Sequence, residues 1–216
     1  MKKMLTLALA LVMALTLAAC GGGQSGGDVD YVKEKGTLIV GMTDFAPMDY
    51  RDESGEWIGF DADMAKAFAK SLGVEVQFVE INWDNKAMEL ETKAIDAVWN
   101  GMTLTDDVKA LMGTSEPYCM NAQVVVLSAA LADQYRSAGS LGGLSFAVEN
   151  GSAGMEALDG LGLPYTAVDT QAKALMEVAS GSSDACVIDL LMAGAMIGEG
   201  TSYPDLATAV ELESEQ

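Results

Sequence analysis

Predicted strands and amphipathic helices alternate along most of this chain, and that alternation restricts the fold to the α/β class. Short apolar runs predict strands at residues 37–40, 74–81, 97–99, 123–127, 144–148, 165–168 and 185–188. Apolar residues at helical spacing predict helices at residues 61–72, 84–93, 152–161, 171–179 and 190–197, and Thr105 caps a further short helix. Since strand-helix-strand units form parallel sheets, we expect mostly parallel pairing.

The alternation falls into two units of similar size that meet near residues 119–123. We expect lobe 1 at residues 36–118, a hinge at residues 119–123 and lobe 2 at residues 124–216. Ligands of open α/β sheets bind beyond the carboxyl ends of the strands. Two facing lobes therefore predict a binding site in the cleft between them.

The first residues follow the plan of a bacterial secretory signal. Lys2 and Lys3 precede an apolar run over residues 4–15, which is too short for a comfortable membrane span, and residues 17–20 read Leu-Ala-Ala-Cys. This ending resembles a lipobox, so residues 1–19 are predicted to be a lipoprotein signal peptide and Cys20 to carry the lipid. The alternative is an ordinary secretory signal whose cleavage site abuts a cysteine. Residues 20–35 are then a flexible tether that holds an extracytoplasmic protein at the cell membrane.

Charge and composition exclude several classes of function. The formal net charge is −20, which argues against nucleic-acid binding. The chain has no histidine, which excludes Ser-His and Cys-His catalysis and any histidine-ligated metal. Cys119 and Cys186 do not have metal-ligand spacing, and the sequence leaves open whether they are free thiols or a disulfide. We predict no catalytic residue, metal or cofactor.

Residues 59–68 read Gly-Phe-Asp-Ala-Asp-Met-Ala-Lys-Ala-Phe, which resembles the signature of the family 3 extracellular solute-binding proteins. These are the amino-acid receptors of ABC importers. In physical terms the segment is a turn glycine, a core aromatic, a capping aspartate and an apolar helix face, so Asp61 and Asp63 are structural rather than catalytic. Further segments resemble the family in its own order, at residues 45–50, 82–83, 100–105, 115–118, 149–153 and 184–189.

The resemblance implies a two-lobe, periplasmic-binding-protein-like fold of the Venus-flytrap type that closes around its solute. It assigns ligand binding to Phe45, Trp83, Asn100, Gly101, Thr103, Gly151, Ser152 and Asp189. The two aromatics form walls, and the loop at residues 100–105 binds the carboxylate and amine of the solute. Gly151 and Ser152 open a helix whose N-terminus attracts an anion, and Asp189 takes an ammonium group.

Each of these residues also fits a purely structural role. Phe45 and Trp83 fit core aromatics, and Thr103 fits a hydroxyl at a strand end. Ser152 fits an N-cap, and Asp189 fits a cap for the helix that begins at the next residue. The order of the segments along the chain favours the functional interpretation.

Two departures from the family pattern matter. Val108 stands where the family places an arginine that binds the α-carboxylate of the solute. Lys109 is adjacent, but one step along a helix turns a side chain by about 100°, so it points away. Losing the charge-assisted bond lowers affinity by about 10- to 150-fold, which leaves the identity of the solute open. In the family, a segment like residues 211–216 leads into a second hinge strand, so that strand and the C-terminal part of lobe 1 are expected to be missing.

The predicted function is capture of a small polar solute, with an amino acid as the leading candidate, and its delivery to the membrane permease of an ABC importer. One alternative is a surface lipoprotein fragment that binds nothing, which Val108 and the expected short C-terminus favour. The other is a dehydratase-like enzyme on the same fold. Its candidate acid is Glu149, which otherwise fits a solvated residue at a strand end. We expect a protein that is not an enzyme.

Overall fold

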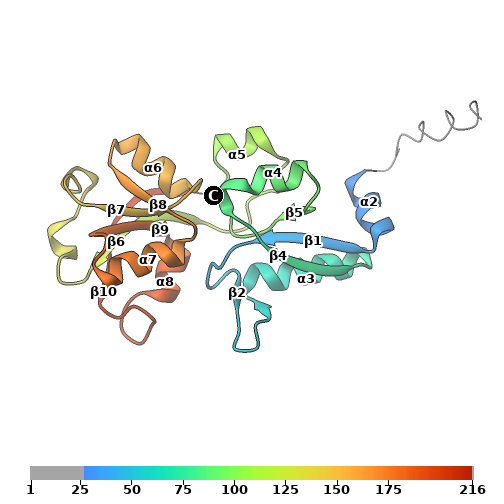
Figure 1. Ribbon diagram of the computed structural model, residues 1–216, viewed down its shortest axis with the longest axis horizontal. Coiled ribbons are helices and arrows are strands. Elements are labelled where there is room, and N and C mark those ends of the chain that lie inside the picture. Colours follow the sequence, from blue (N-terminus) through green and yellow to red (C-terminus); the bar gives the residue numbers. More distant parts are fainter. Residues whose placement is uncertain (1–26, 216) are drawn as a thin grey trace, which may run out of the picture. The chain divides into compact units, whose positions relative to one another are not determined.

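The computed structural model describes residues 27–215 and divides the chain after Lys35 into two units (Figure 1). The predicted signal peptide, the predicted lipidation site Cys20 and residues 21–26 of the predicted tether lie outside the described residues. The first unit contains helix α2 (Asp28–Lys35), so the C-terminal part of the predicted tether is helical. This helix has few apolar residues, so the spacing of apolar residues did not predict it. Acidic residues in its first turn and lysines in its last turn complement the helix dipole. None of the helices within residues 27–215 has the length and apolar character needed to cross a bilayer.

Lobe 1 is built on a three-stranded parallel sheet in the order β4-β1-β5. The strands are β1 (Thr37–Met42), β4 (Glu75–Glu80) and β5 (Ala97–Val98). Helix α3 (Phe60–Leu72) connects β1 to β4, and the turn η2 (Trp83–Asn85) with helix α4 (Lys86–Glu91) connects β4 to β5. A small hairpin of β2 (Tyr50–Arg51) and β3 (Trp57–Ile58) precedes α3, and α5 (Asp106–Leu111) follows β5. Thr105 caps α5 as predicted, because its hydroxyl accepts from Val108 N–H.

Lobe 2 is built on a five-stranded mixed sheet in the order β10-β6-β9-β7-β8. The strands are β6 (Asn121–Ser128), β7 (Phe146–Glu149), β8 (Tyr165–Val168), β9 (Ala185–Asp189) and β10 (Leu206–Glu215). β7 pairs in parallel with β8 and β9, whereas β6 is antiparallel to both β9 and β10. The expectation of mostly parallel pairing is therefore wrong at β6, because no single helical crossover connects it to the strands beside it.

Strand β10 was not predicted, and it extends through most of the segment that the resemblance placed before a second hinge strand. It pairs with β6 from Leu206 opposite Ser128 to Glu215 opposite Asn121, with two irregularities in register. Residues 211–215 are thus already part of the lobe 2 sheet, and they reach the point at which the chain enters β6.

Helices cover both faces of the lobe 2 sheet (Figure 1). Because side chains alternate along a strand, Val124 and Val126 pack in one apolar cluster and Val125 and Leu127 in another. The first cluster contains residues of α7 (Gln171–Ser180) and α8 (Leu190–Met196), and the second contains residues of α6 (Ala153–Leu161). Short turns η3 (Ala132–Gln134) and η4 (Ala138–Ser140) lie between β6 and β7. The sequence left open whether Cys119 and Cys186 form a disulfide. In the structure both are free thiols, with Cys186 buried in the first cluster and Cys119 half-buried.

Lobe 1 buries two carboxylates, Asp49 and Asp61, whose side chains have no measurable exposure. Neither oxygen of Asp49 has a hydrogen-bond partner among the described residues. Burial, followed by the nearby charge of Asp61, raises the pKa of Asp49 to about 8, and the backbone N–H of Ala62 opposes this only in part. Asp49 is therefore protonated in the folded protein at neutral pH.

Replacing Asp49 with asparagine should stabilise the protein in a pH-dependent way. Since the folded pKa lies above the unfolded value, folded protein keeps a proton that unfolded protein releases between pH 4 and 8, and the stability of the wild type falls across this range. We expect Asp49→Asn to raise the unfolding free energy by about 1–3 kcal/mol at pH 8 and to have little effect at pH 4, measured by urea unfolding. The exposed Glu53→Gln serves as control. An equal gain at both pH values, or a loss at pH 8, contradicts the assignment.

Candidate functional site

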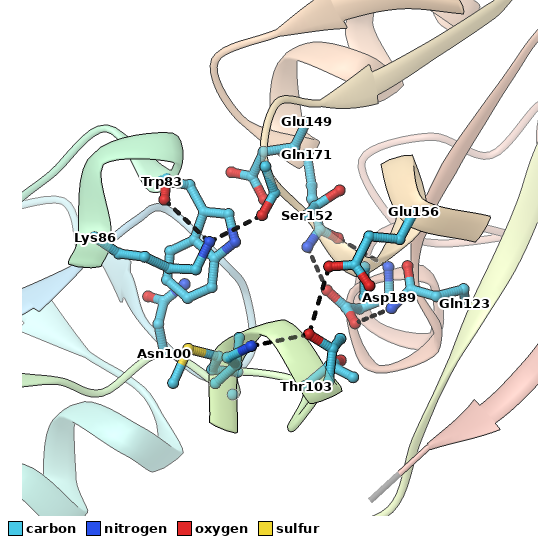
Figure 2. A pocket seen from close by; sticks show the side chains of 16 residues that line it. Trp83, Lys86, Asn100, Thr103, Gln123, Glu149, Ser152, Glu156, Gln171 and Asp189 are labelled. Carbon is cyan, nitrogen blue, oxygen red and sulfur yellow. Dashed lines mark hydrogen bonds between the residues drawn. The ribbon is translucent and has the colours of Figure 1, made fainter. Parts of the chain in front are cut away.

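A small pocket lies between segments of the two sheets (Figure 2). Lobe 1 contributes η2, the first residue of α4, the loop that follows β5 and part of α5. Lobe 2 contributes the ends of β7 and β9, the start of α6 and α7, and one residue of β6. Most of these segments follow the carboxyl ends of strands, which is the position expected for a ligand site in an open α/β sheet.

The pocket brings together all but one of the residues that the sequence proposed for ligand binding. Its lining includes Trp83, Asn100, Gly101, Thr103, Gly151, Ser152 and Asp189. The exception is Phe45, which is 2 % exposed and belongs to an apolar core cluster. A methyl group added to Gly101 would lie 2.7 Å from Cε1 of Phe45, so the ring supports this loop from below rather than forming a wall of the pocket.

Asp189 ends β9 and is held by three side-chain amides. Asn121 and Gln123 donate to Oδ1, the latter at 2.9 Å, and Gln171 donates to Oδ2. The backbone N–H of Asp189 donates back to Gln171 Oε1 at 2.8 Å. Although α8 begins at the next residue, the Asp189 side chain makes no capping bond. The structure therefore orients this carboxylate through neutral amides at the pocket rather than through the helix.

Sequence reasoning did not identify these amide partners. Gln123 lies directly opposite Asp189 in the β6–β9 register, and Gln171 is the first residue of α7. The sequence offered only a weak indication of them, because Gln123 is a polar residue near the start of an otherwise apolar strand and Gln171 is a polar residue at a helix start. Their meaning depends on strand pairing between residues far apart in the chain.

The loop after β5 is shaped by its contacts with lobe 1. Asn100 Oδ1 accepts from Thr43 N–H at 2.7 Å, and Asn100 Nδ2 donates to Thr43 Oγ1 at 2.8 Å. Gly101 N–H donates to Asp61 Oδ2 at 2.5 Å, with a positive φ of +56° that favours glycine. Asn100 therefore ties the ends of β1 and β5 together, and Thr103 extends this loop along the pocket.

The turn before α6 combines a glycine and a capping serine. Gly151 has a φ of +69°, and Ser152 Oγ accepts from Met155 N–H at 3.2 Å, so the N-cap role expected for Ser152 is confirmed. The start of a nine-residue helix thus borders the pocket, and its unpaired N–H groups favour a negative ligand group there.

Glu149 is a buried residue of the pocket, not the solvated strand-end residue that its position in the sequence indicated. It is 3 % exposed, and its Oε1 has no hydrogen-bond partner within the described residues. Burial, followed by the charge of Asp189, raises the pKa of Glu149 to about 8, while Gln171 and Lys86 act in the opposite direction. At neutral pH Glu149 therefore carries a proton and can donate a hydrogen bond.

Hydrogen bonds cross from lobe 1 to lobe 2 at the pocket. Lys86 Nζ donates to Gly151 O at 2.9 Å, and Thr105 Oγ1 donates to Glu156 Oε1 at 3.4 Å. Val108, at the position where the family places an arginine, is buried and lines the pocket. Lys109 is exposed and lines a different surface groove, in agreement with its expected direction.

Comparisons with known proteins agree with this architecture. The family model described as bacterial extracellular solute-binding proteins, family 3, matches residues 38–187. The L-cystine-binding protein TcyJ of Escherichia coli (strain K12) is 30 % identical over 84 % of this chain and 71 % of that protein. The structure of holo ArgBP from T. maritima superposes with a TM-score of 0.79 at 35 % identity, covering 87 % of this chain and 83 % of that one. The ancestral amino acid-binding protein AncCDT-1, a precursor of cyclohexadienyl dehydratase, superposes with a TM-score of 0.78 at 32 % identity, covering 88 % and 83 %. This chain, with its two α/β lobes, belongs to the bacterial extracellular solute-binding proteins, family 3.

Proposed function

We propose that this protein captures an amino acid outside the cytoplasm and delivers it to an ABC importer, with the lobes closing around the solute. The observation that carries the proposal is Asp189: an aspartate oriented by three amides, at a pocket lined by both lobes. A carboxylate placed in this way suits the ammonium group that all α-amino acids share.

The other residues of the pocket complement the rest of an amino acid. The N-terminus of α6 at Ser152 and the loop from Asn100 to Thr103 offer backbone and hydroxyl groups for the solute carboxylate. Trp83 offers an aromatic wall for its side chain. In this arrangement Phe45 positions the loop at Gly101 without contacting the solute.

Delivery follows from the family's mode of action. A solute that contacts both lobes favours the closed state, and the permease of the importer recognises that state. We place the hinge at residues 119–123, between lobe 1 at residues 36–118 and lobe 2 at residues 124–216. Lipidation of Cys20 would keep the protein near its permease at the membrane surface.

An enzymatic role is the less favoured alternative. Glu149 is a protonated acid at the pocket, which is the one feature that a dehydratase would need. The similar proteins named above are, by their own descriptions, binding proteins. We propose that Glu149 donates a hydrogen bond to the solute and transfers no proton, so incubation with prephenate should give no turnover.

Binding should be measured first, by thermal-shift titration of the purified protein against the common amino acids. A bound amino acid raises the melting temperature in a saturable, concentration-dependent way, because it stabilises only the folded state. The absence of stabilisation by every amino acid, in a protein that melts cooperatively, would contradict the proposed function.

Asp189→Asn tests the ammonium partner directly. Loss of a charge-assisted hydrogen bond should weaken binding of the stabilising amino acid by about 10- to 100-fold in isothermal titration calorimetry. Asp169→Asn, which removes an exposed carboxylate from the same lobe, is the matched control and should bind as the wild type does. Equal affinities for Asp189→Asn and the control would contradict the assignment.

Gly151→Ala tests whether closure depends on the close approach of the two lobes. A Cβ at Gly151 would lie 2.9 Å from Asp84 Oδ1 and 3.0 Å from Asp84 Cα, so the backbone of lobe 1 must move away. Gly162→Ala is the control: Gly162 has a similar φ of +67°, and nothing lies within 4 Å of its added Cβ. Both variants should lose about 1–2 kcal/mol of stability to backbone strain, but only Gly151→Ala should lose affinity, by about tenfold or more. An affinity loss of the same size in Gly162→Ala would show that strain, not contact, is responsible.

A further inference from the structure

Lys86 is the one basic residue that lines the pocket within the described part of the chain. It is the first residue of α4, directly after the turn that carries Trp83, and its Nζ lies 4.8 Å from the centre of the Trp83 ring. Nζ donates to two backbone carbonyl oxygens, Gly151 O at 2.9 Å and Trp83 O at 3.3 Å. Figure 2 shows Lys86 and Trp83 on one side of the pocket and Asp189 on the other.

The ammonium group of Lys86 retains capacity for a ligand. An ammonium has three N–H donors, and two of them are used by the carbonyl groups. Among residues 27–215, no carboxylate lies within ion-pair distance of this nitrogen. Its positive charge is therefore not neutralised by direct contact. Burial lowers the pKa of Lys86, and the carboxyl groups of Glu149, Asp84 and Glu156 oppose this from farther away.

Several groups that favour an anion converge beside Lys86. Its bond to Gly151 O places Nζ next to the turn that begins α6, whose first residues line the pocket. Glu149 is nearly fully buried at the same pocket, and its Oε1 has no protein partner among the described residues. A lysine ammonium, a helix N-terminus and a buried carboxyl group with one unpartnered oxygen therefore border one small volume.

We propose that Lys86 binds the carboxylate of the captured amino acid and so replaces the arginine that the family pattern places at position 108. This inference rests on the proposed function and identifies a specificity-determining residue of the same site. Val108 lies in the same pocket and offers only an apolar side chain. Lys86 reaches the site from a different element, α4 rather than α5, on a flexible four-carbon stem. With Lys86 for the carboxylate and Asp189 for the ammonium group, the site selects solutes that carry both charges.

A simpler role for Lys86 makes a different prediction. If Lys86 only holds the lobes together through Gly151 O, its removal weakens the closed state for every ligand alike. If it binds the solute carboxylate, its removal affects only ligands that have one. Pairs of amino acids and their decarboxylated amines separate these cases.

The experiment measures affinities by isothermal titration calorimetry for three pairs: L-arginine and agmatine, L-histidine and histamine, and L-cystine and cystamine. Wild type should bind at least one amino acid about 10- to 100-fold more tightly than its amine. Lys86→Met should reduce that preference to about threefold or less, mainly by lowering the affinity for the amino acid. Lys86→Arg should retain the preference, and Lys109→Met, which removes an exposed lysine outside the pocket, should behave as wild type.

Several outcomes would overturn the proposal. A full preference retained in Lys86→Met shows that another group binds the carboxylate, and an equal loss for both members of a pair shows a role in closure alone. A wild type that binds amine and amino acid equally also overturns it, while still supporting solute capture. A wild type that binds neither member of any pair, and that melts cooperatively but is stabilised by none of the common amino acids, overturns the proposal together with the function on which it rests. Should Lys86→Met fail to melt cooperatively, loss of the preference in Lys86→Arg would count against the proposal.

Discussion

The buried carboxylate of Asp61 holds the lobe 1 side of the pocket in place. Its Oδ2 accepts from the backbone N–H of Gly101 at 2.5 Å and from the hydroxyl of Tyr118 at 3.0 Å. Asp61 lies in the first turn of α3, Gly101 lies in the pocket loop, and Tyr118 lies just before the hinge. One side chain thus fixes the pocket loop to the segment through which the chain leaves lobe 1. The charge is costly to bury, and these two donors offset part of that cost.

The elements that the sequence predicted are those with local signals. Helix α3 has an apolar face and a glycine after its last turn, and Ser152 and Thr105 are capping residues in sequence as in structure. Helix α2 lacks an apolar face, and the pairing of β10 with β6 joins residues 78 to 94 positions apart (206 − 128 and 215 − 121), so local patterns could not reveal either. The arrangement of the β6 strand, antiparallel to its neighbours, has the same long-range origin.

The sequence could predict which segments meet at the site. It could not predict which side chains line the pocket and which are buried beneath it. Asn100 and Phe45 occur in segments that the family order placed at the pocket, and both support it from within: Asn100 through Thr43, and Phe45 beneath Gly101. Conversely, Glu149 fitted a solvated strand-end residue and Lys86 was assigned no role from the sequence, yet both line the pocket in the structure. The sequence pattern shows that a residue lies near the end of a strand. Whether its side chain is buried, and where it points, depends on packing against the other sheet.

The division of charge between the lobes explains how such a pocket can select its solute. Lys86 belongs to lobe 1 and Asp189 to lobe 2, so a solute with only one charge engages mainly one lobe. A zwitterion engages both, and its two charged contacts form together only when the lobes are close. Closure is shifted by the difference in binding energy between the open and closed states, not by total affinity. With the roles proposed for Lys86 and Asp189, closure itself is the step that discriminates amino acids from simple amines and simple acids.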